Sequence, residues 1–446
     1  MMRISGREMT KLTLALILCL LTCASIVICV LFCPVFRLRR LRLSAYWVCA
    51  LTGALLLLLT GRISPGALFA GLSADTAINP LKILVLFFSM TALSVYLDEI
   101  GFFRYLAGTV LRRAGTNQRR LFLCLYVTVA TLTVFTSNDI IVLTFTPFIC
   151  YLAKNAGIDP LPYLMAEFVA ANTWSMLLLI GNPTNIYLSA SAGISFAGYL
   201  RVMALPTLLA GILSLALLLF LFRHPLAHPM ETTQPPVEPI RDRVGLGIGL
   251  AHLCLCTIAL AVSSYLSLPM WLIALGFALS LLLCVGLRSL IGRKKPTAIA
   301  HTLRRLPWQL IPFVLSMFTL VLTLGEYGVT ARIAAWIGTE GSIVSYGVLS
   351  FLSANLINNI PMSVLFSSVL DSIAGSAAYM GGVYASVIGS NIGAYLTPLG
   401  ALAGIMWMAL LREQRVPLSF GEFIRHGAAI ACPALLAALL GLAVVL

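Results

Sequence analysis

The sequence contains few charged residues. Asp, Glu, Lys and Arg together make up 10% of its 446 residues, whereas they make up about 25% of a typical soluble domain. Apolar residues make up 60% of the chain, which is more than a soluble domain can bury in its core. The shortage of charge therefore excludes an ordinary soluble protein and indicates a protein embedded in a lipid bilayer.

The sequence also lacks the motifs of common enzyme classes. It contains neither the HExxH pattern of zinc peptidases nor the GxSxG pattern of serine hydrolases. Its five histidines, at positions 224, 228, 252, 301 and 426, are scattered and lie mostly in loops. An intramembrane enzyme would need a nucleophile with a base, or a cluster of metal ligands. We therefore predict a protein that is not an enzyme and that has no resident metal or cofactor beyond a coupling ion, either sodium or a proton.

Cysteine is present but shows no pattern that indicates a disulfide framework. The eleven cysteines lie inside apolar stretches, where cysteine behaves as a small apolar residue. We therefore predict no thiol–metal site.

Long apolar runs without charge are the main feature that the chain does have. Most of them reach or exceed the roughly 20 residues that span a bilayer as a helix. The first run is too long for the apolar part of a signal peptide and no small-residue cleavage site follows it, so we expect a retained helix. The runs cover residues 12–36, 43–61, 168–200, 202–222, 244–287, 306–325, 341–370, 372–411 and 426–446. We predict an all-α polytopic membrane protein with about 10 to 12 transmembrane helices.

The net charge of +14 is concentrated in short loops between the apolar runs. In a soluble protein this excess would suggest nucleic acid as a partner, but here it reports orientation in the membrane. The basic loops cover residues 37–42, 104–120, 223–243, 288–305 and 412–425. An alternating helix trace places all five on one side, which the positive-inside rule makes cytoplasmic, although Arg3, Arg7 and Lys11 then lie outside. We expect a multi-pass protein of the cell's inner (cytoplasmic) membrane with no nucleic-acid partner.

The second half of the sequence repeats the first. Residues 84–102 match 311–329, 137–145 match 358–366, and 194–201 match 418–425, in the same order. The first match pairs Ser89 with Ser316, Glu99 with Glu326 and Gly101 with Gly328. The loop after Leu97 is basic, whereas the loop after Leu324 lies an odd number of helices away and should face the other side. We predict two inverted-topology repeats, 1–223 and 244–446, joined by an exposed proline-rich cytoplasmic linker, 224–243.

Four polar segments interrupt the apolar runs. Two are rich in asparagine, residues 136–139 and 358–361, and we name them the first and second Asn-rich segments. The other two are rich in glycine and proline, residues 181–185 and residues 389–391 with 397–400. Non-helical backbone at membrane depth is tolerated only where it lines a cavity or the protein interior. We predict that each half supplies one re-entrant hairpin tip and one broken helix, with breaks at Gly181, Pro183, Pro361, Pro398 and Gly400.

The polar side chains of these segments are candidates for binding a small ion. Unwound carbonyls and Asn, Ser and Thr oxygens can replace the hydration shell of a cation, and helix N-termini can face an anion. The alternative is that they are kinks and interhelical hydrogen bonds, which membrane bundles commonly contain. The predicted binding residues are Ser137, Asn138, Asp139, Asn172, Asn182, Thr184, Asn185, Asn358, Asn359, Ser390, Asn391 and Thr397.

Acidic residues within the apolar sequence are candidates for coupling, because charge is costly in a bilayer. Asp139 lies in the first Asn-rich segment, where its counterpart in the second is the neutral Asn359. We predict that Asp139 couples transport to a proton or cation, the alternative being a structural carboxylate. Glu167 is the second coupling candidate, the alternative being a helix-end position. We place Asp98, Glu99 and Glu326 at the membrane interface, with gating as an alternative, and Asp371 in a loop.

The motifs of this chain resemble those of the arsenite permeases, the arsenical pump membrane proteins. The stretches YLDEIGFF, TSND, GNPTNI, LRRLPWQLIPF, NNIP and IGSNIGAYLTPLGAL occur in the order seen in that family. The resemblance covers nearly the whole chain and extends to the wider ion-transporter superfamily, which includes sodium/proton antiporters and sodium-coupled dicarboxylate and citrate carriers. The chain departs from the permease pattern at Asn391 and Tyr395, where that pattern has an acidic and a basic residue, and at Glu167.

The resemblance implies a scaffold domain and a transport domain in each protomer of a homodimer. It places Asn182, Thr184 and Asn185 opposite the first hairpin tip. It places Thr397, Pro398 and Gly400 opposite the second. The implied function is secondary transport, namely proton-coupled arsenite or antimonite efflux, with a soluble ATPase subunit as a partner if the chain is an arsenite pump. The alternative is a sodium-coupled anion carrier or a sodium/proton antiporter.

Overall fold

The computed structural model describes residues 6–33, 35–38, 41–75, 79–230, 240, 242–263, 268–293 and 297–446. Within these ranges, nine helices are long and apolar enough to cross a membrane. The expected all-helical, multi-span membrane protein is therefore confirmed. Half of the predicted linker, residues 231–239 and 241, lies outside the described ranges.

A small hairpin is the one departure from all-helical structure in the part of the chain that is described. β1 (Val35–Leu38) pairs antiparallel with β2 (Leu41–Ser44), and Val35 lies opposite Ser44. Its sequence alternates apolar residues with arginine, and this period of two is typical of a strand. We did not predict it, because the basic residues were interpreted only as a topology signal.

The first half of the chain contains ten α-helices and a 3₁₀ turn. They are α1 (Gly6–Phe32), α2 (Ala45–Leu59), α3 (Pro65–Ser73), α4 (Pro80–Glu99), α5 (Phe102–Ala114), α6 (Gln118–Phe135), α7 (Asn138–Ala156), α8 (Leu161–Trp174), η1 (Leu179–Gly181), α9 (Pro183–Ser191) and α10 (Phe196–Leu221). The first Asn-rich segment joins α6 to α7.

The second half continues with another ten α-helices, after a short 3₁₀ turn. The elements are η2 (Pro225–Ala227), α11 (Arg243–Ala261), α12 (Met270–Ile291), α13 (Thr297–Arg305), α14 (Leu310–Glu326), α15 (Val329–Ile337), α16 (Ser342–Ile357), α17 (Asn359–Asp371), α18 (Ala378–Gly393), α19 (Leu402–Glu413) and α20 (Phe420–Val445). The second Asn-rich segment joins α16 to α17.

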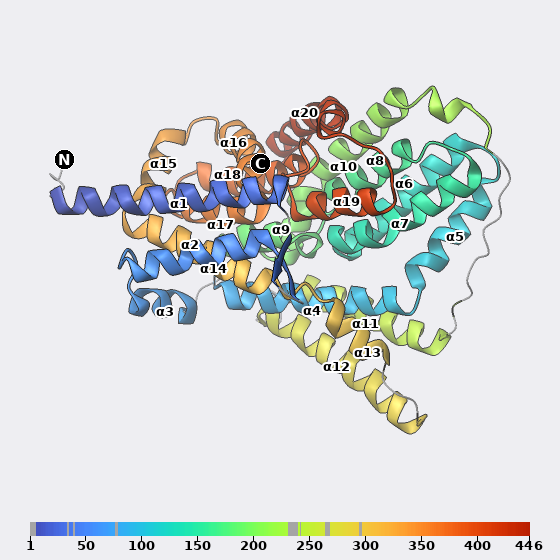
Figure 1. The fold of residues 1–446 in the computed structure, drawn as a ribbon, viewed down its shortest axis with the longest axis horizontal. Coiled ribbons are helices and arrows are strands. Elements are labelled where there is room, and N and C mark those ends of the chain that lie inside the picture. Colours follow the sequence, from blue (N-terminus) through green and yellow to red (C-terminus); the bar gives the residue numbers. More distant parts are fainter. Residues whose placement is uncertain are drawn as a thin grey trace.

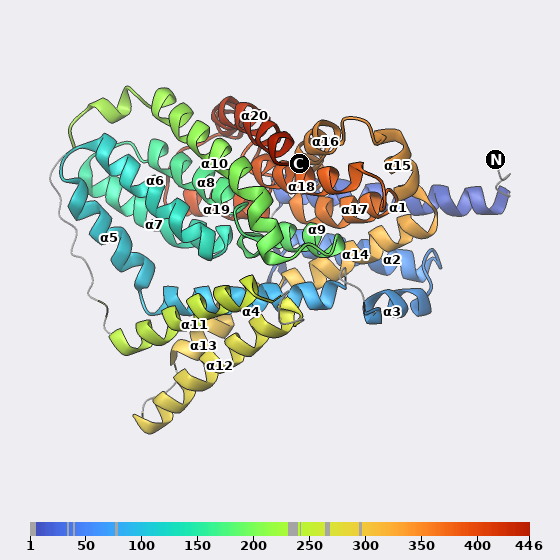
Figure 2. The same ribbon diagram turned by 180° about the vertical axis from the view of Figure 1, so that it is seen from behind.

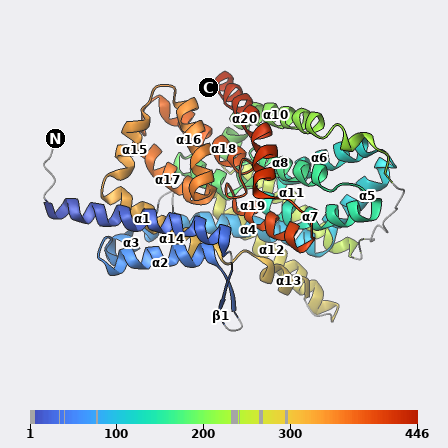
Figure 3. The same ribbon diagram turned by 45° about the horizontal axis from the view of Figure 1, so that its top comes forward.

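The helices form two groups that lie one above the other in Figures 1 and 2. In the lower group, α4 packs against α11, α12 and α13, and α14 packs against α2. In the upper group, α10 packs against α20, α16 against α18, and α6 against α8. Figure 3 shows the β-hairpin projecting away from both groups. The interrupted helices thus all belong to the upper group.

The two halves arrange their elements in the same order, and their matched residues have the same local roles. Gly101 and Gly328 both precede a helix in the left-handed conformation, with φ of 85° and 68°. Ser195 and Ser419 both cap the N-terminus of a long C-terminal helix. The halves also interlock, because α9 packs against α17 and α19 packs against α7.

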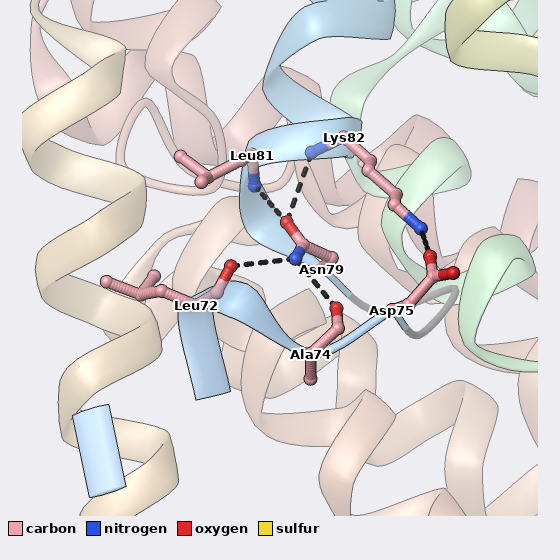
Figure 4. Close-up of polar contacts among 6 residues, drawn as sticks. All are labelled: Leu72, Ala74, Asp75, Asn79, Leu81 and Lys82. Carbon is pink, nitrogen blue, oxygen red and sulfur yellow. Dashed lines mark hydrogen bonds and ion pairs between the residues drawn. The ribbon is translucent and has the colours of Figure 1, made fainter. Parts of the chain in front are cut away.

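The start of α4 is fixed by Asn79 (Figure 4). Its buried side-chain amide donates to the carbonyls of Leu72 (2.8 Å) and Ala74 (2.9 Å). Its side-chain oxygen accepts from two backbone N–H groups of the first turn of α4, at 2.8 and 3.3 Å. Lys82 in that turn pairs with Asp75, and this pairing holds the pKa of the Asp75 carboxyl below its usual range. One end of α4 is thus anchored to the chain that precedes it.

Candidate functional site

The first break, residues 175–182, separates α8 from α9. Backbone carbonyls of this break that have no partner within a helix accept hydrogen bonds from side chains. The Asn185 amide donates to the carbonyls of Ser175 (2.8 Å) and Leu178 (3.3 Å). The Tyr199 hydroxyl donates to the carbonyl of Met176 (2.9 Å). A backbone that leaves the helix inside a membrane needs such partners. The break is therefore a built feature of the fold and not a simple kink.

Gly181 allows the first break to be this tight. A Cβ atom at this position would lie 2.4 Å from the Ser175 carbonyl oxygen, so no other residue fits without moving the backbone. Pro183 does not interrupt a helix, since it is the first residue of α9. That position tolerates proline, because its N–H has no partner within the helix.

The second break, residues 394–401, separates α18 from α19 and is held by residues around the second Asn-rich segment. The Asn355 side-chain oxygen accepts from the backbone N–H (3.1 Å) and hydroxyl (2.7 Å) of Thr397. The Asn358 amide donates to the Leu399 carbonyl at 3.0 Å. The Asn359 backbone N–H donates to the Gly400 carbonyl at 3.1 Å. The second Asn-rich segment and the second break thus form one unit.

Glycine and proline take different roles in the second half. A Cβ atom on Gly400 would lie 2.3 Å from the Gly393 carbonyl oxygen, which requires glycine there. Pro398 lies within the break. Pro361 does not break a helix, because it lies in the first turn of α17. Residues 389–391, which we predicted as part of the break, are the helical end of α18, and the break begins after Gly393.

Asn391 joins the two broken helices. Its side-chain oxygen accepts from the Ser175 hydroxyl (3.0 Å) and the Asn182 amide (2.9 Å). Its amide donates to the Asn185 side-chain oxygen (2.7 Å) and to the Val387 carbonyl (2.8 Å). All of its hydrogen-bonding capacity is used in a fully buried position. The first break and α18 are therefore fixed to each other.

The first Asn-rich segment connects to this crossing through α8. The Asn138 amide donates to the Asn172 side-chain oxygen at 3.0 Å. The Ser175 oxygen lies 2.8 Å from the Asn172 carbonyl and 3.0 Å from the Asn391 side-chain oxygen, so its single hydrogen is shared between these two acceptors. A continuous hydrogen-bonded path thus runs from the start of α7 to the crossing of the two broken helices.

Asp139 lies beside this path and faces a cavity. The cavity has a volume of about 490 Å³, and Ser137, Arg304, Arg305 and Gln309 also line it. Asp139 makes neither a hydrogen bond nor an ion pair with any residue of the described ranges. A carboxyl group that is free to exchange a proton or bind a cation is thus accessible from this cavity.

Ion pairs lie at the wall of the same cavity. The Arg305 guanidinium bridges Asp98 and Glu99 at the end of α4, with an N–O distance of 2.6 Å to each. His301 lies 3.4 Å from Glu99. The two acidic residues thus lie at the end of α4, and their pairing ties α4 to the C-terminal end of α13.

A second cavity lies at the opposite end of α4. It has a volume of about 440 Å³, and its lining includes Asp75, Lys82, Ile186, Ser195 and Trp271. Because α9 contributes Ile186, this cavity reaches the helix that follows the first break. The helices that follow the two breaks thus reach these cavities, since α19 lines the first cavity and α9 lines the second.

Glu167 lies apart from both cavities. Its side chain is completely buried, and both of its oxygens accept from the Thr146 hydroxyl, at 3.0 and 3.1 Å. Its recorded hydrogen bonds within the described chain go to Thr146 and not to the residues of the two breaks. The structure therefore separates the two coupling candidates, since Asp139 faces a cavity and Glu167 is sealed.

Several of the predicted polar residues carry buried oxygens without a hydrogen-bond partner in the described part of the chain. These are Thr184 Oγ1, Ser390 Oγ and Asn359 Oδ1. Unpaired buried polar atoms are uncommon in native folds and mark places where a ligand or water can bind. No group of three or more His, Cys, Asp and Glu side chains gathers among the described residues, so uncharged oxygens supply most of the candidate ligands.

Sequence reasoning missed two residues of this site. Ser175 and Asn355 each make hydrogen bonds that hold a broken helix. Asn355 could have been found, because it lies one helical turn before the second Asn-rich segment and so faces the same side. Ser175 gave no such signal, since its partner Asn391 lies in the other half.

Comparisons with known proteins agree with this architecture. The "Arsenical pump membrane protein" of Escherichia coli strain K12 is 28% identical over 411 residues, which is 88% of this chain and 92% of that protein. An uncharacterized transporter of Mycobacterium tuberculosis strain H37Rv is 26% identical, over 78% of this chain and 82% of that protein. The resemblance to the arsenical pump membrane proteins is thus confirmed.

A solved structure shares the fold. The crystal structure of the Alcanivorax borkumensis YdaH transporter, described as having an unusual topology, aligns with a TM-score of 0.54 over 97% of both chains at 17% identity. The family described as "Citrate transporter" matches residues 27–389, which is most of the sequence. The chain is therefore a secondary transporter and not an enzyme, and it belongs to the citrate transporter (CitMHS) family.

Proposed function

We propose that this protein exports arsenite or antimonite in exchange for protons, with Asp139 as the proton-binding group. The observation that carries the proposal is the position of Asp139, which faces a cavity without a partner in the described chain and directly follows Asn138. The substrate comes from relatives that are named arsenical pump membrane proteins. A hydroxylated, uncharged solute suits a site made of amides and hydroxyls.

Proton coupling requires that protonation favours one conformation over the other. A ligand shifts such an equilibrium only through unequal affinity for the two states. When Asp139 faces a water-filled cavity, its charged form is solvated, and closing the cavity favours the neutral form. Binding of a proton would therefore permit closure, and its loss would hold the cavity open.

The repeats supply the moving parts of the proposed mechanism. We infer that residues 1–223 and 244–446 are inverted-topology repeats and that the two Asn-rich segments are tips of re-entrant hairpins. The shared order of elements, the matched glycines Gly101 and Gly328, and the packing of α9 on α17 and α19 on α7 support this inference. We further propose a homodimer in the inner membrane that can take a soluble ATPase subunit as its partner.

The test is metalloid resistance and transport. Expression in a bacterium that lacks its own arsenite pump should restore growth on arsenite and antimonite, and everted vesicles should accumulate arsenite when a proton gradient is imposed. Asp139→Asn should abolish both activities. Asp159→Asn, the same change at an exposed loop residue, should leave them unchanged. If Asp139→Asn vesicles still accumulate arsenite against its gradient, Asp139 is not the coupling group.

The second candidate function is sodium-coupled uptake of an anion such as citrate, or sodium/proton exchange. The name of the matched family supports it, and uncharged oxygens at helix breaks also suit sodium. If well-expressed protein gives no metalloid protection and sodium drives citrate uptake into proteoliposomes, this candidate replaces the first.

A further inference from the structure

Glu167 is a buried acidic group that the proposed transport cycle does not use. It lies on α8, five residues before Asn172, and its side chain is completely inaccessible to solvent. Thr146 of α7, which faces it, is equally buried. An acidic residue in this environment needs either a partner that neutralises it or a proton of its own.

Among the described residues, no Lys, Arg or His forms an ion pair with Glu167. From α7 the Thr146 hydroxyl and the Cys150 thiol face its carboxyl, and from α19 the Trp407 indole lies beside it. The Trp407 N–H completes no full hydrogen bond with any described residue, but it is a further donor that interacts with the Glu167 carboxyl. The other helices packed against α8, namely α6, α10 and α18, bring no Lys, Arg or His of the described chain into an ion pair with it.

The hydrogen bonding favours a neutral acid. The Thr146 oxygen lies 3.0 and 3.1 Å from the two carboxyl oxygens, but a hydroxyl has a single hydrogen and cannot fully satisfy both. A carboxylate anion would have unsatisfied lone pairs in an apolar interior. A carboxylic acid instead has a hydrogen of its own to donate, and Thr146 can accept it.

The contact has a structural role, because it is one of two polar contacts between the same pair of helices. Asn138 on α7 donates to Asn172 on α8, and about two turns further along α7 Thr146 donates to Glu167. The first contact belongs to the candidate transport site, and Asp139 follows it directly. The second contact therefore fixes how α7 lies against α8 and where it holds Asp139.

We infer that Glu167 keeps its proton throughout transport and is a positioning residue, which holds α7 against α8 so that Asn138 and Asp139 are correctly placed. The functional part of this inference rests on the proposed function. The role differs from that of Asp139, which exchanges its proton.

The first measurement is infrared spectroscopy of the purified full-length protein. The wild type should show a protonated-carboxyl band that persists from acidic to alkaline buffer and disappears in Glu167→Gln. In Thr146→Val the band should remain but shift in frequency, because its hydrogen bond is lost. A band that is absent from the wild type, or that disappears as the buffer is made alkaline, would overturn the inference.

The second measurement is transport. Glu167→Gln keeps the shape and the neutral donor, so its rate and pH profile should match the wild type. Glu167→Ala and Thr146→Val should lower the rate about tenfold or more, since a displacement of about 1 Å at a site can cost 10²-fold. A folded Glu167→Gln protein that loses its proton dependence would show that Glu167 exchanges its proton, and wild-type rates in both other variants would exclude a positioning role.

These readouts separate the inference from the proposed function. If wild-type vesicles move neither arsenite nor antimonite, the proposed substrate is wrong, yet the infrared band still decides whether Glu167 is protonated. In that case the positioning role is read from thermal unfolding in detergent. Glu167→Gln should unfold with the wild type and Glu167→Ala well below it, and equal unfolding of all three would overturn the role.

Discussion

The two Asn-rich segments occupy matched places in the two halves but are held differently. The second is tied to the break in its own half, since Asn358 and Asn359 both bond the backbone of residues 399–400. The first makes one hydrogen bond to a helix other than α6 and α7 within the described chain, from Asn138 to the Asn172 side chain, and leaves Asp139 facing a cavity. The two halves of the chain thus supply one closed segment and one open segment, and this difference supports the proposal that Asp139 is the coupling group.

The surroundings explain why the acid occurs only in the first segment. At Asn359 the side-chain oxygen is buried and has no partner in the described chain, so a carboxylate there would be unsolvated and unpaired. Asp139 lines a cavity of about 490 Å³, which can hold water. The same scaffold therefore tolerates a charge in one half and not in the other.

Exchanging Asp139 and Asn359 should have the largest effect on transport. Asp139→Asn alone should abolish proton-driven transport, and adding Asn359→Asp should not restore it, because the cavity beside the second segment measures only about 20 Å³ and is lined mainly by apolar residues. The double variant should also lose stability by about 3 kcal/mol or more, as expected for a buried, unpaired carboxylate. Transport in vesicles and thermal unfolding in detergent would measure the two effects.

Recovery of transport in the double variant would show that the two segments are equivalent. The acid could then act from either half, and the cavity beside Asp139 would not be the feature that determines its role. The single variant Asn359→Asp, with Asp139 intact, is the control that separates loss of stability from loss of coupling.

Disturbing the packing of the second break should lower stability by a smaller amount. Gly400→Ala places a Cβ atom 2.3 Å from the Gly393 carbonyl oxygen, so the second break must shift, and the bond from the Asn359 N–H should weaken. Overpacking of this kind costs about 1 to 3 kcal/mol, which should lower the unfolding temperature in detergent.

Gly247→Ala is the matched control for that change. Gly247 lies within α11, and a Cβ atom added there would have no neighbour within 4 Å. The substitution should be neutral or stabilise the helix by up to about 1 kcal/mol. If Gly400→Ala unfolds at the same temperature as Gly247→Ala, the second break is not the rigid unit described above.

The helical, multi-span fold could be predicted from the apolar runs, since their length is set by the bilayer. The polar residues of the site could also be found, because Asn, Gly and Pro clusters at membrane depth are unusual. The hydrogen-bond partners of these residues could not be predicted from the sequence. Asn391 meets Asn185 across 206 positions of sequence, and no local pattern encodes a contact between two halves.

The roles of the two acids show the same limit. Sequence placed Asp139 and Glu167 together as coupling candidates, because both interrupt apolar runs. The two acids differ in whether their side chains reach a cavity, and this depends on which helices pack around each of them. The β-hairpin of residues 35–44 was missed for a different reason, since its alternating pattern is local but was assigned to topology alone.

The smallest expected effect concerns the wall of the open cavity. Arg305→Gln removes the ion pairs with Asp98 and Glu99. A fully buried pair that loses one partner costs about 3 to 5 kcal/mol, but the Arg305 side chain is 40% exposed. Solvent screening reduces the expected loss to about 1 to 2 kcal/mol, and the difference from the wild type should narrow at high salt, which weakens exposed ion pairs.

Asp75→Asn tests whether the loss of stability is specific to the end of α4 that borders the Asp139 cavity. It removes the ion pair with Lys82 at the other end of α4, where the Asp75 side chain is 92% exposed, so we expect no measurable change in unfolding temperature. Equal and small effects of both variants would mean that α4 is held mainly by its packing against α11 and α12. A larger effect of Arg305→Gln would show that the cavity of Asp139 is bounded by a charged contact that must be preserved for the open segment to stay open.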